Sequence, residues 1–349
     1  MKHTYIFTYI LLLSCLNLLA QTTDFVTGLS GVQGMALNGN DLYVVELGKN
    51  KIVKIDLTAD TPKAIDVITG LSGPRQLYFN GNDLYISEYS GNKISKINIR
   101  DTPPMAMDVV TGLSGPQGMA LNGNDLFIAE SNGNKISKID ITDSPPTATD
   151  VVTDLFSPRQ LVLNGDDLYI AEYLGNKISK IDISAASPSA TEVLWAGAPT
   201  FILLHENEIY IAEEAARDII SKFDVRDANP TKTDVVTGLT TPRGIVIKDD
   251  IIYITVGNIS GKVVSSQLPL STNGGSLTEN ISLFPNPSSA FVEVSGLSQS
   301  DEYIIYNTLG KEVSTGDISS SEKIDVSDLI PGFYILKLGS GKAFRFVRE

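Results

Sequence analysis

A glutamate recurs at nearly constant spacing along the chain, each time at the end of a short apolar run. The five members of this set are Glu46, Glu88, Glu130, Glu172 and Glu213. Carboxylates that are brought together in space can bind calcium, which favours several oxygen ligands. One of them can also serve as a general acid or base if its pKa is raised. The recurrence therefore raises the hypothesis of a calcium site or a hydrolytic centre.

The alternative is that each glutamate is structural. A carboxylate in a repeated unit can accept hydrogen bonds from the loop that directly follows its own strand or pair with an arginine, and such networks recur without a function. We favour this interpretation for any single glutamate. Calcium is then the only cofactor that the sequence suggests, and the sequence does not require it. Val256 stands at the sixth place of the series.

A second set of residues alternates instead of recurring uniformly. Arg75 and Arg159 belong to units that also have a tyrosine after the glutamate, Tyr89 and Tyr173. Aromatic rings beside arginine suit stacking on sugars or gripping of peptides. The equally weighted alternative is that the tyrosines only cover their loops. The predicted ligand-binding residues are Arg75, Tyr89, Arg159, Tyr173, Trp195 and Arg243, with the sole tryptophan expected in a loop on the same surface.

Other chemistries are excluded or unsupported by the composition. The sequence has two histidines, His3 and His205, and the first lies in an N-terminal leader, so a histidine pair is excluded. The formal net charge of −14 argues against nucleic-acid partners, which need clustered cations. We find no phosphate-binding glycine loop, serine-nucleophile elbow or zinc motif. We therefore assign no catalytic residue and favour a binding module over an enzyme.

Internal repetition shows which elements position these residues. An acidic residue followed by two apolar ones recurs about every 42 residues, beginning at Asp41, Asp83, Asp125, Asp167, Glu208 and Asp250. Around this marker each repeat has runs with strand-type alternation that are separated by turns such as Asn80-Gly81. Four short strands per repeat of this length are typical of a β-propeller, with one blade per repeat.

The order of the strands predicts how the ring closes. The chain begins with a fourth-strand sequence near Phe25, and the last repeat lacks its own fourth strand. We expect the segment near Phe25 to pair with residues 262–267, which removes the exposed edges of a linear array. The predicted fold class is all-β: a six-bladed β-propeller over residues 24–267, closed by the N-terminal strand. In a propeller, the loops before each first strand and the loops between each second and third strand open on the same face. The arginines and glutamates are therefore expected on that face.

At this point the repeats resemble a known group. The pattern is Pro, then Asp-Leu-Tyr-Ile-Ala-Glu, then Gly-Asn-Lys-Ile-x-Lys-Ile-Asp, as in residues 167–182. It resembles NHL and YncE-like propellers and, more distantly, the gluconolactonase propellers. The resemblance implies a propeller fold and leaves the activity open, since such relatives include binding modules, scaffolds and hydrolases. The alternative function is accordingly a calcium-dependent hydrolase or lactonase.

The N-terminus is predicted to be a targeting segment. Lys2 and His3 precede an apolar run, and a small residue, Ala20, follows it. We interpret residues 1–20 as a secretory signal peptide that is too short for a membrane span. The alternative is a lipoprotein signal that leaves a lipidated Cys15, the only cysteine of the chain.

The C-terminal part has a different pattern. A Gly/Ser-rich linker is expected over residues 268–279, and short alternating strands follow over residues 280–349, which predicts a small Ig-like β-sandwich. This segment closely resembles the type IX secretion (Por secretion) sorting domain. The matching motif residues are Pro285, Asn286, Pro287, Gly310 and Gly332.

The sorting-domain resemblance implies the route and destination of the protein. It implies a partner, the type IX secretion machinery, and export to the medium or to the outer-membrane surface of a Gram-negative bacterium. No segment after the leader is apolar enough to span a bilayer. We therefore predict a monomeric, exported propeller that binds an unidentified glycan, peptide or protein.

Overall fold

The protein is described by a computed structural model that covers residues 22–215, 217–257, 259–268, 282–295, 297, 300–308, 310–319, 322–339 and 343–349. The expected leader with Cys15, and the linker beyond Leu268, lie outside these residues. The described chain is all-β apart from one short 3-10 turn, Leu47–Lys49. It divides into two compact units, with the boundary after Leu268. None of its helices is long and apolar enough to cross a membrane, within the part of the chain that is described.

Four-stranded antiparallel sheets make up the first unit, and five of them use consecutive strands. The first is β2 (Val32–Asn38), β3 (Asp41–Glu46), β4 (Lys51–Asp56) and β5 (Ile65–Ile68). The next two are β6 (Pro74–Asn80), β7 (Asp83–Glu88), β8 (Lys93–Asn98), β9 (Met107–Thr111), and β10 (Pro116–Asn122), β11 (Asp125–Glu130), β12 (Lys135–Asp140), β13 (Thr149–Val152). Then come β14 (Pro158–Asn164), β15 (Asp167–Glu172), β16 (Lys177–Asp182), β17 (Thr191–Trp195), and β18 (Pro199–His205), β19 (Glu208–Glu213), β20 (Ile219–Asp224), β21 (Thr233–Val236).

The last sheet is completed by the N-terminal strand. β22 (Pro242–Lys248), β23 (Ile251–Val256) and β24 (Gly261–Gln267) are joined by β1 (Thr23–Leu29). β1 runs antiparallel to β24, with Thr23 opposite Ser265 and Leu29 opposite Gly261. This pairing confirms the predicted partner of the N-terminal strand. It also uses the hydrogen-bonding edge that β24 would otherwise leave open.

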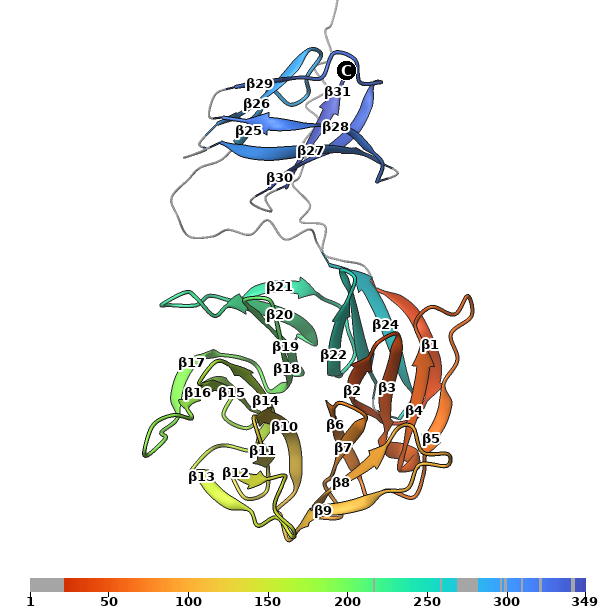
Figure 1. Ribbon diagram of the computed structural model, residues 1–349, viewed down its shortest axis with the longest axis vertical. Coiled ribbons are helices and arrows are strands. Elements are labelled where there is room, and N and C mark those ends of the chain that lie inside the picture. Colours follow the sequence, from red (N-terminus) through yellow and green to blue (C-terminus); the bar gives the residue numbers. More distant parts are fainter. Residues whose placement is uncertain are drawn as a thin grey trace, which may run out of the picture. The chain divides into compact units, whose positions relative to one another are not determined.

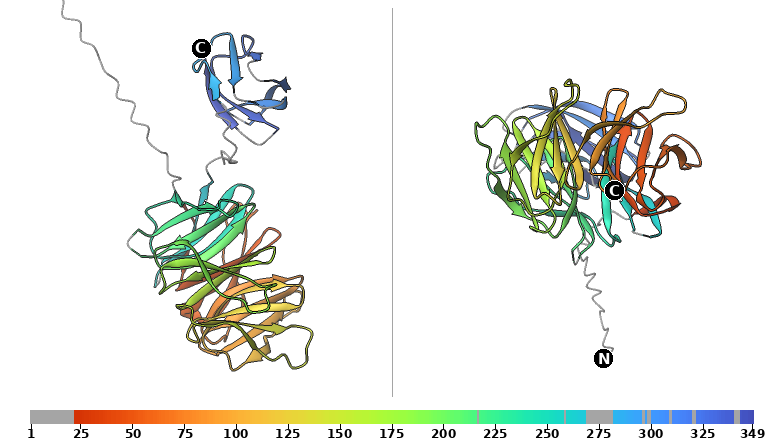
Figure 2. Two further views of the ribbon diagram at one scale, coloured as in Figure 1. Left: turned by 90° about the vertical axis from the view of Figure 1, so that its left-hand side faces the viewer. Right: turned by 90° about the horizontal axis from the view of Figure 1, so that it is seen from below.

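The sheets are arranged around a common centre, with their first strands nearest to it (Figure 1). Seen from the side, the strands run across the thickness of the unit (Figure 2). Buried apolar clusters fill the space between each sheet and the next. Tyr43 of β3 packs with Leu84 of β7, for example, and Tyr253 of β23 packs with Leu42 of β3. Because the second contact joins the last sheet to the first, the ring of sheets is closed.

Repeated motif residues explain the local geometry. Asn92, in the Gly-Asn-Lys turn after β7, adopts a positive φ of 51° and accepts a 3.0 Å hydrogen bond from the backbone N–H of Gly115 in the next repeat. Asn is one of the few residues that tolerate this conformation, and its side chain links neighbouring sheets. Asp83, which opens the Asp-Leu-Tyr motif, accepts a 2.8 Å bond from Lys96 across the sheet. The sequence repeat therefore encodes a turn, a hydrogen bond to the neighbouring sheet and a cross-strand ion pair.

The second unit consists of two antiparallel sheets around one core. The first sheet is β25 (Ser282–Phe284), β26 (Phe291–Ser295) and β29 (Lys323–Asp325), and the second is β27 (Asp301–Asn307), β28 (Glu312–Ile318), β30 (Gly332–Leu338) and β31 (Ala343–Arg348). Val292 of the first sheet and Leu336 and Phe346 of the second are fully enclosed. Alternation of buried and exposed residues along β26 and β30 follows from one face packing inward.

The motif residues of this unit occupy turns and edges. Asn286 donates from Nδ2 to the carbonyl of Arg345 at 2.8 Å and accepts from the N–H of Val347 at 2.9 Å. One side chain thus fastens the start of the unit to its last strand. Gly310 has a positive φ of 74° in the turn after β27, a conformation that costs glycine little. Gly332 is the first residue of β30, and Pro285 and Pro287 flank Asn286.

Candidate ligand-binding face

One face of the first unit is formed by two kinds of loop, which bond to each other in every sheet. These are the loops that precede each first strand and the loops between each second and third strand. The N–H of Tyr89, for example, donates to the carbonyl of Gly73 at 2.9 Å, and the N–H of Tyr173 donates to that of Ser157 at 3.2 Å. The predicted co-location of these loops is confirmed. We call this surface the arginine face, because Arg75, Arg159 and Arg243 stand on it.

The five glutamates also lie on this side, and each is enclosed by its own sheet. Glu88 is 2% exposed and accepts hydrogen bonds from the N–H of Ser72 at 2.6 Å and from Ser95 Oγ at 2.6 Å. Lys93 Nζ lies 3.6 Å from Glu88 Oε1. The same backbone bond recurs in the other sheets, from Ser30 to Glu46, Ser114 to Glu130, Phe156 to Glu172 and Gly197 to Glu213.

This geometry explains why the glutamates recur. Each carboxylate fixes the loop before the first strand of its sheet, rather than the loop after the second strand that the sequence suggested. The described residues contain no group of three or more His, Cys, Asp or Glu side chains that could hold a metal ion. Glu46, Glu88, Glu130, Glu172 and Glu213 are therefore not brought together into one ligand set.

The arginines, by contrast, approach one another. Arg243 Nη2 donates to Glu214 Oε1 at 2.7 Å, and Arg159 Nη1 lies 4.0 Å from Glu214 Oε2. Arg75 donates to the neutral amide oxygen of Gln33 at 3.2 Å. All three begin the first strands of their sheets, at the second residue of β6, β14 and β22. The sequence predicted the three arginines but gave no special role to Glu214.

Burial and repulsion by neighbouring arginines lower the pKa of Arg75 and Arg159. Desolvation is the largest cause for Arg159, whose pKa falls to about 10, with further lowering by Arg243 and Arg75 and opposing contributions from Tyr173 and Glu214. Desolvation likewise lowers the pKa of Arg75, opposed by Tyr89. Both side chains remain charged at neutral pH, so the face presents concentrated positive charge in an acidic protein.

The two tyrosines pack on these arginines. The guanidinium carbon of Arg159 lies 3.2 Å from the ring centroid of Tyr173, and that of Arg75 lies 4.9 Å from Tyr89. Each hydroxyl reaches the next sheet, where Tyr89 bonds to Asn132 at 2.7 Å and Tyr173 to Glu214 at 3.1 Å. The tyrosines thus stack on cations and also join neighbouring sheets. The predicted pairing of aromatic and arginine within a repeat is present in both cases.

Trp195 differs from its expected position. It is the last residue of strand β17 rather than part of a loop. Its side chain is 61% exposed, and Lys232 Nζ lies 4.7 Å from its ring centroid. Lys232 also pairs with Glu213 at 2.7 Å. It replaces the lysine of the third strand that pairs with the glutamate in earlier sheets, as Lys93 does with Glu88. The corresponding residue in the β18–β21 sheet is Ile219.

Two further apolar side chains, missed by the sequence reasoning, are exposed on the same sheet. Phe156, before β14, is 57% exposed, and Leu174, after β15, is 68% exposed. The N–H of Leu174 donates to the carbonyl of Phe156 at 3.2 Å. Other sheets have small or polar residues at these two places, namely Ser30, Ser72, Ser114, Gly197 and Thr240, and Gly48, Ser90, Asn132 and Ala215. A comparison of repeats position by position would have found them.

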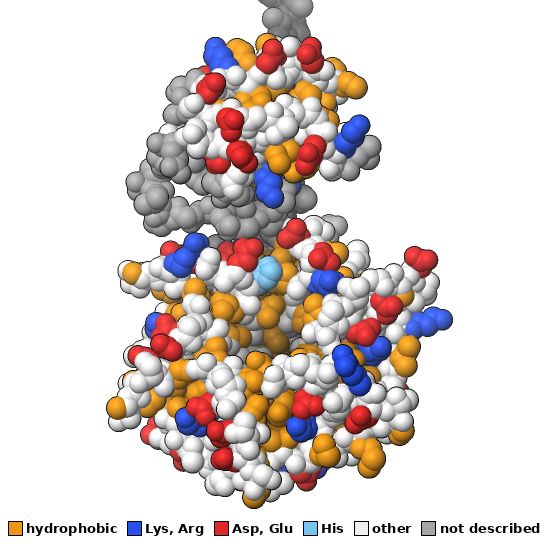
Figure 3. All heavy atoms as spheres, in the orientation of Figure 1, with side chains coloured by type: hydrophobic (Ala, Val, Ile, Leu, Met, Phe, Trp, Pro, Cys, Tyr) orange, Lys and Arg blue, Asp and Glu red, His pale blue; other side chains and the backbone are white. Residues whose placement is uncertain are grey.

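A cavity opens on the opposite face, where first and second strands are joined by turns. It has a volume of about 500 Å³ and is lined by first-strand residues of every sheet, including Leu37, Phe79, Leu121 and Leu204. Figure 3 shows apolar side chains around this cavity, and His205 is among the residues that line it. Because similar residues recur in each sheet, the lining follows from how the first strands pack.

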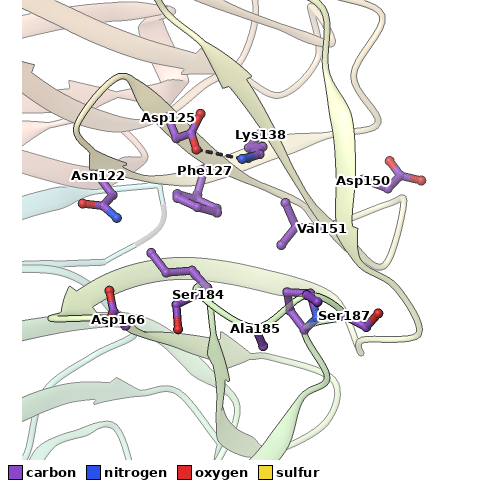
Figure 4. A pocket seen from close by; sticks show the side chains of 13 residues that line it. Asn122, Asp125, Phe127, Lys138, Asp150, Val151, Asp166, Ser184, Ala185 and Ser187 are labelled. Carbon is purple, nitrogen blue, oxygen red and sulfur yellow. Dashed lines mark hydrogen bonds and ion pairs between the residues drawn. The ribbon is translucent and has the colours of Figure 1, made fainter.

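A second cavity of about 600 Å³ lies between the β10–β13 and β14–β17 sheets. Asp125 accepts a 2.7 Å hydrogen bond from Lys138 on one side of the cavity, and Asp166 and Ser184 belong to the neighbouring sheet on the other side (Figure 4). The Asp125–Lys138 pair is the same cross-strand pair that is found in other repeats. This cavity therefore contains scaffold residues, and we regard the arginine face as the candidate site.

Comparison with known proteins defines the class of each unit. Residues 282–348 match the family described as "Secretion system C-terminal sorting domain". The second unit is therefore a sorting domain of the type IX secretion system, which indicates export. Comparison of the sequence with curated proteins gave no match.

The first unit is similar to solved β-propellers. A streptogramin B lyase shares 18% identity at a TM-score of 0.54, covering 72% of this chain and 98% of that one. A gluconolactonase from Xanthomonas campestris shares 13% identity at a TM-score of 0.60, over 72% and 90% of the two chains. A chain of the nidogen/laminin complex shares 15% identity at a TM-score of 0.52, over 84% and 93%. At such identities the likeness establishes the β-propeller fold alone.

Proposed function

We propose that this protein is an exported six-bladed β-propeller that binds a ligand or protein on its arginine face. The proposed domains are a signal peptide (1–20), the propeller (24–267), a linker (268–279) and an Ig-like sorting domain (280–349). The sorting domain would pass the propeller to the type IX secretion machinery. The mature protein is then released or held at the outer-membrane surface as a monomer.

One observation favours a binding role for this face above all. Phe156, Leu174 and Trp195 are exposed on a single sheet, at positions where most other sheets have small or polar residues. Repetition of the scaffold does not explain them, and clustered exposed apolar side chains commonly mark interaction sites. The same sheet also contributes Arg159 and Tyr173, which stack on each other, and an aromatic ring with an arginine suits recognition of glycans or peptides.

A glycan and peptide array tests the binding role. The exported, processed protein should be captured by a subset of ligands, and a variant with Tyr89→Ala and Trp195→Ala should lose that capture. Arg226→Met is a matched control, because Arg226 pairs with Asp224 in an exposed loop away from these residues. Equal capture of all three proteins would refute the assignment of the face.

The export route has its own test. Removing residues 280–349 should leave the propeller inside the cell, whereas the full chain should reach the surface or the medium. Mass spectrometry of the exported protein would give its N-terminus, either at Gln21 or at a lipidated Cys15. Secretion of the truncated chain at the normal level would contradict the proposed role of the sorting domain.

A calcium-dependent hydrolase or lactonase is the second candidate, because a gluconolactonase is among the similar folds. Such a hydrolase would require one or more of the five glutamates to give up its hydrogen bond to the loop amide and to bind the metal instead. Thermal unfolding with calcium and with chelator separates the two functions. A rise in unfolding temperature with calcium, together with metal in the purified protein, would favour the hydrolase.

A further inference from the structure

We propose that Arg75, Arg159 and Arg243 form a site for a carboxylate group of the ligand. This inference rests on the proposed function, since it names the chemistry that the arginine face recognises. The three residues stand at intervals of 84 residues and occupy the same place in alternate sheets, β6, β14 and β22. In a closed ring of sheets, that spacing distributes three guanidinium groups evenly about one centre.

The cluster has more positive than negative charge. Glu214 is the carboxylate that contacts it, through Arg243 at 2.7 Å and Arg159 at 4.0 Å. Arg75 donates to Gln33, which is neutral. Among the described contacts of these arginines, one carboxylate faces three guanidinium groups, within a chain of net charge −14. Like charges held this closely are destabilising unless an anion lies among them.

Partial burial makes this excess significant. The side chains of Arg159 and Arg243 are 19% and 13% exposed, so water screens them less than it screens surface charges. The Nε atoms of Arg75 and Arg159 are shielded from solvent and have no hydrogen-bond partner among the described residues. A bound anion would offset the free-energy cost of holding these charges, which gives the cluster a reason to bind one.

Glu214 shows which anion fits. Its carboxylate accepts from Arg243 through Oε1 and from the hydroxyl of Tyr173 through Oε2, at 2.7 and 3.1 Å. The equivalent loop position varies in the other sheets, and Glu214 is the carboxylate among residues that are otherwise Leu47, Tyr89, Ser131, Tyr173 and Gly257. Planar guanidinium groups bind carboxylates through paired N–H donors. The chain therefore already places one carboxylate at part of the site, and a ligand carboxylate would bind at Arg75 or displace Glu214.

Calorimetric titration of the full processed chain at low ionic strength tests this site. The probes are citrate, acetate and inorganic phosphate. We expect citrate to bind more tightly than acetate, since several carboxylates can engage several arginines. Arg159→Met should weaken citrate binding by about tenfold or more, which corresponds to about 1.4 kcal/mol. Glu214→Gln should tighten it by a similar factor, because the competing internal carboxylate loses its charge.

Matched variants exclude trivial explanations. Arg226→Met removes one exposed arginine and should change citrate affinity by less than about twofold, since an exposed charge contributes little. Arg75→Met repeats the test at an arginine that does not contact Glu214, in case Arg159→Met unfolds the protein. Absence of citrate binding to both the unsubstituted chain and Glu214→Gln would overturn the inference. So would tighter binding of phosphate than of citrate, or an equal loss in Arg226→Met.

The outcomes also separate this inference from the proposed function. If arrays show capture that depends on Tyr89 and Trp195 but citrate does not bind, the carboxylate site is wrong and the binding role stands. If citrate binds with the expected variant pattern but no array ligand is captured, the anion site stands and the wider binding face is wrong.

Discussion

The glutamates and the arginines of the propeller share one face but have different environments. Each glutamate recurs in successive sheets and is enclosed by groups of its own sheet, as Glu88 is by Ser72, Ser95 and Lys93. The arginines occur in alternate sheets and approach one another around the centre, where Glu214 contacts two of them. Residues that a fold needs in every unit recur in every unit. Residues that occur in only some of the repeats are candidates for function.

The largest expected effect comes from removing an enclosed glutamate. Glu88→Ala leaves the N–H of Ser72, the hydroxyl of Ser95 and the ammonium of Lys93 without their common partner. We expect the free energy of unfolding to fall by about 2–4 kcal/mol, measured by urea denaturation. Glu192→Ala, at an exposed position of β17, should cost less than about 0.5 kcal/mol. Equal stability of the two variants would remove the structural explanation for the recurring glutamates.

The aromatic residues of the arginine face should behave in the opposite way. Tyr89→Ala combined with Trp195→Ala is expected to weaken ligand capture by about tenfold, close to 1.4 kcal/mol, while the lost hydrogen bond from Tyr89 to Asn132 lowers stability by only about 1 kcal/mol. Trp195 is largely exposed, so its removal leaves no cavity. Capture is measured with a ligand identified on the array, and stability by thermal unfolding. Unchanged capture would place these aromatics with the scaffold instead.

A smaller loss is expected at the turn between sheets. Asn92→Ala removes the acceptor for the N–H of Gly115 and also places alanine at a positive φ, which together should cost about 1–2 kcal/mol. Asn92→Gly removes the same acceptor but tolerates the backbone, so its cost should be lower. Urea denaturation of both variants separates the two contributions. Ligand capture should not change. A change would show that the hydrogen bond between Asn92 and Gly115 and the binding face are coupled.

The smallest effect concerns the cross-strand pairs. The hydrogen bond to Asp83 raises the pKa of Lys96 above its ordinary value of 10.5, and Asp41 and Asp167 do the same for Lys54 and Lys180. A raised lysine pKa contributes stability that is complete below pH 10.5 and is lost as the pH rises through the folded-state value. Because these lysines are partly exposed, we expect a few tenths of a kcal/mol per pair. In urea denaturation, Asp83→Asn should reduce the alkaline loss, and an identical pH profile would contradict the assignment.

Much of the architecture was predictable because it depends on local patterns that repeat. The Asp-Leu-Tyr and Gly-Asn-Lys motifs encode turns and pairs within one or two sheets, as at Asp83 and Asn92. The missing fourth strand of the last repeat predicted that β1 joins β24. Trp195 was expected in the loop after the fourth strand, and this prediction was wrong. Residue 195 is instead the last residue of strand β17, opposite Lys177.

The site was less predictable, because its members meet only across the ring. Sequence spacing placed Arg75, Arg159 and Arg243 in equivalent positions, but it did not reveal that Glu214 lies between two of them. It raised the hypothesis that five glutamates form one set but favoured a structural role for each, and in the structure each accepts a hydrogen bond from a backbone amide of its own sheet. Hydrogen bonds to loop amides depend on loop geometry, and side-chain types alone do not encode that geometry.

The sequence by itself determined the repeat, the strand order, the closing strand and the sorting domain, since each follows from patterns within a few tens of residues. Only the tertiary structure decided which polar side chains are enclosed and which converge. Enclosure depends on the amides and lysines that surround a carboxylate in its sheet. Convergence depends on closure of the ring, which brings residues 84 or more positions apart within reach of one another.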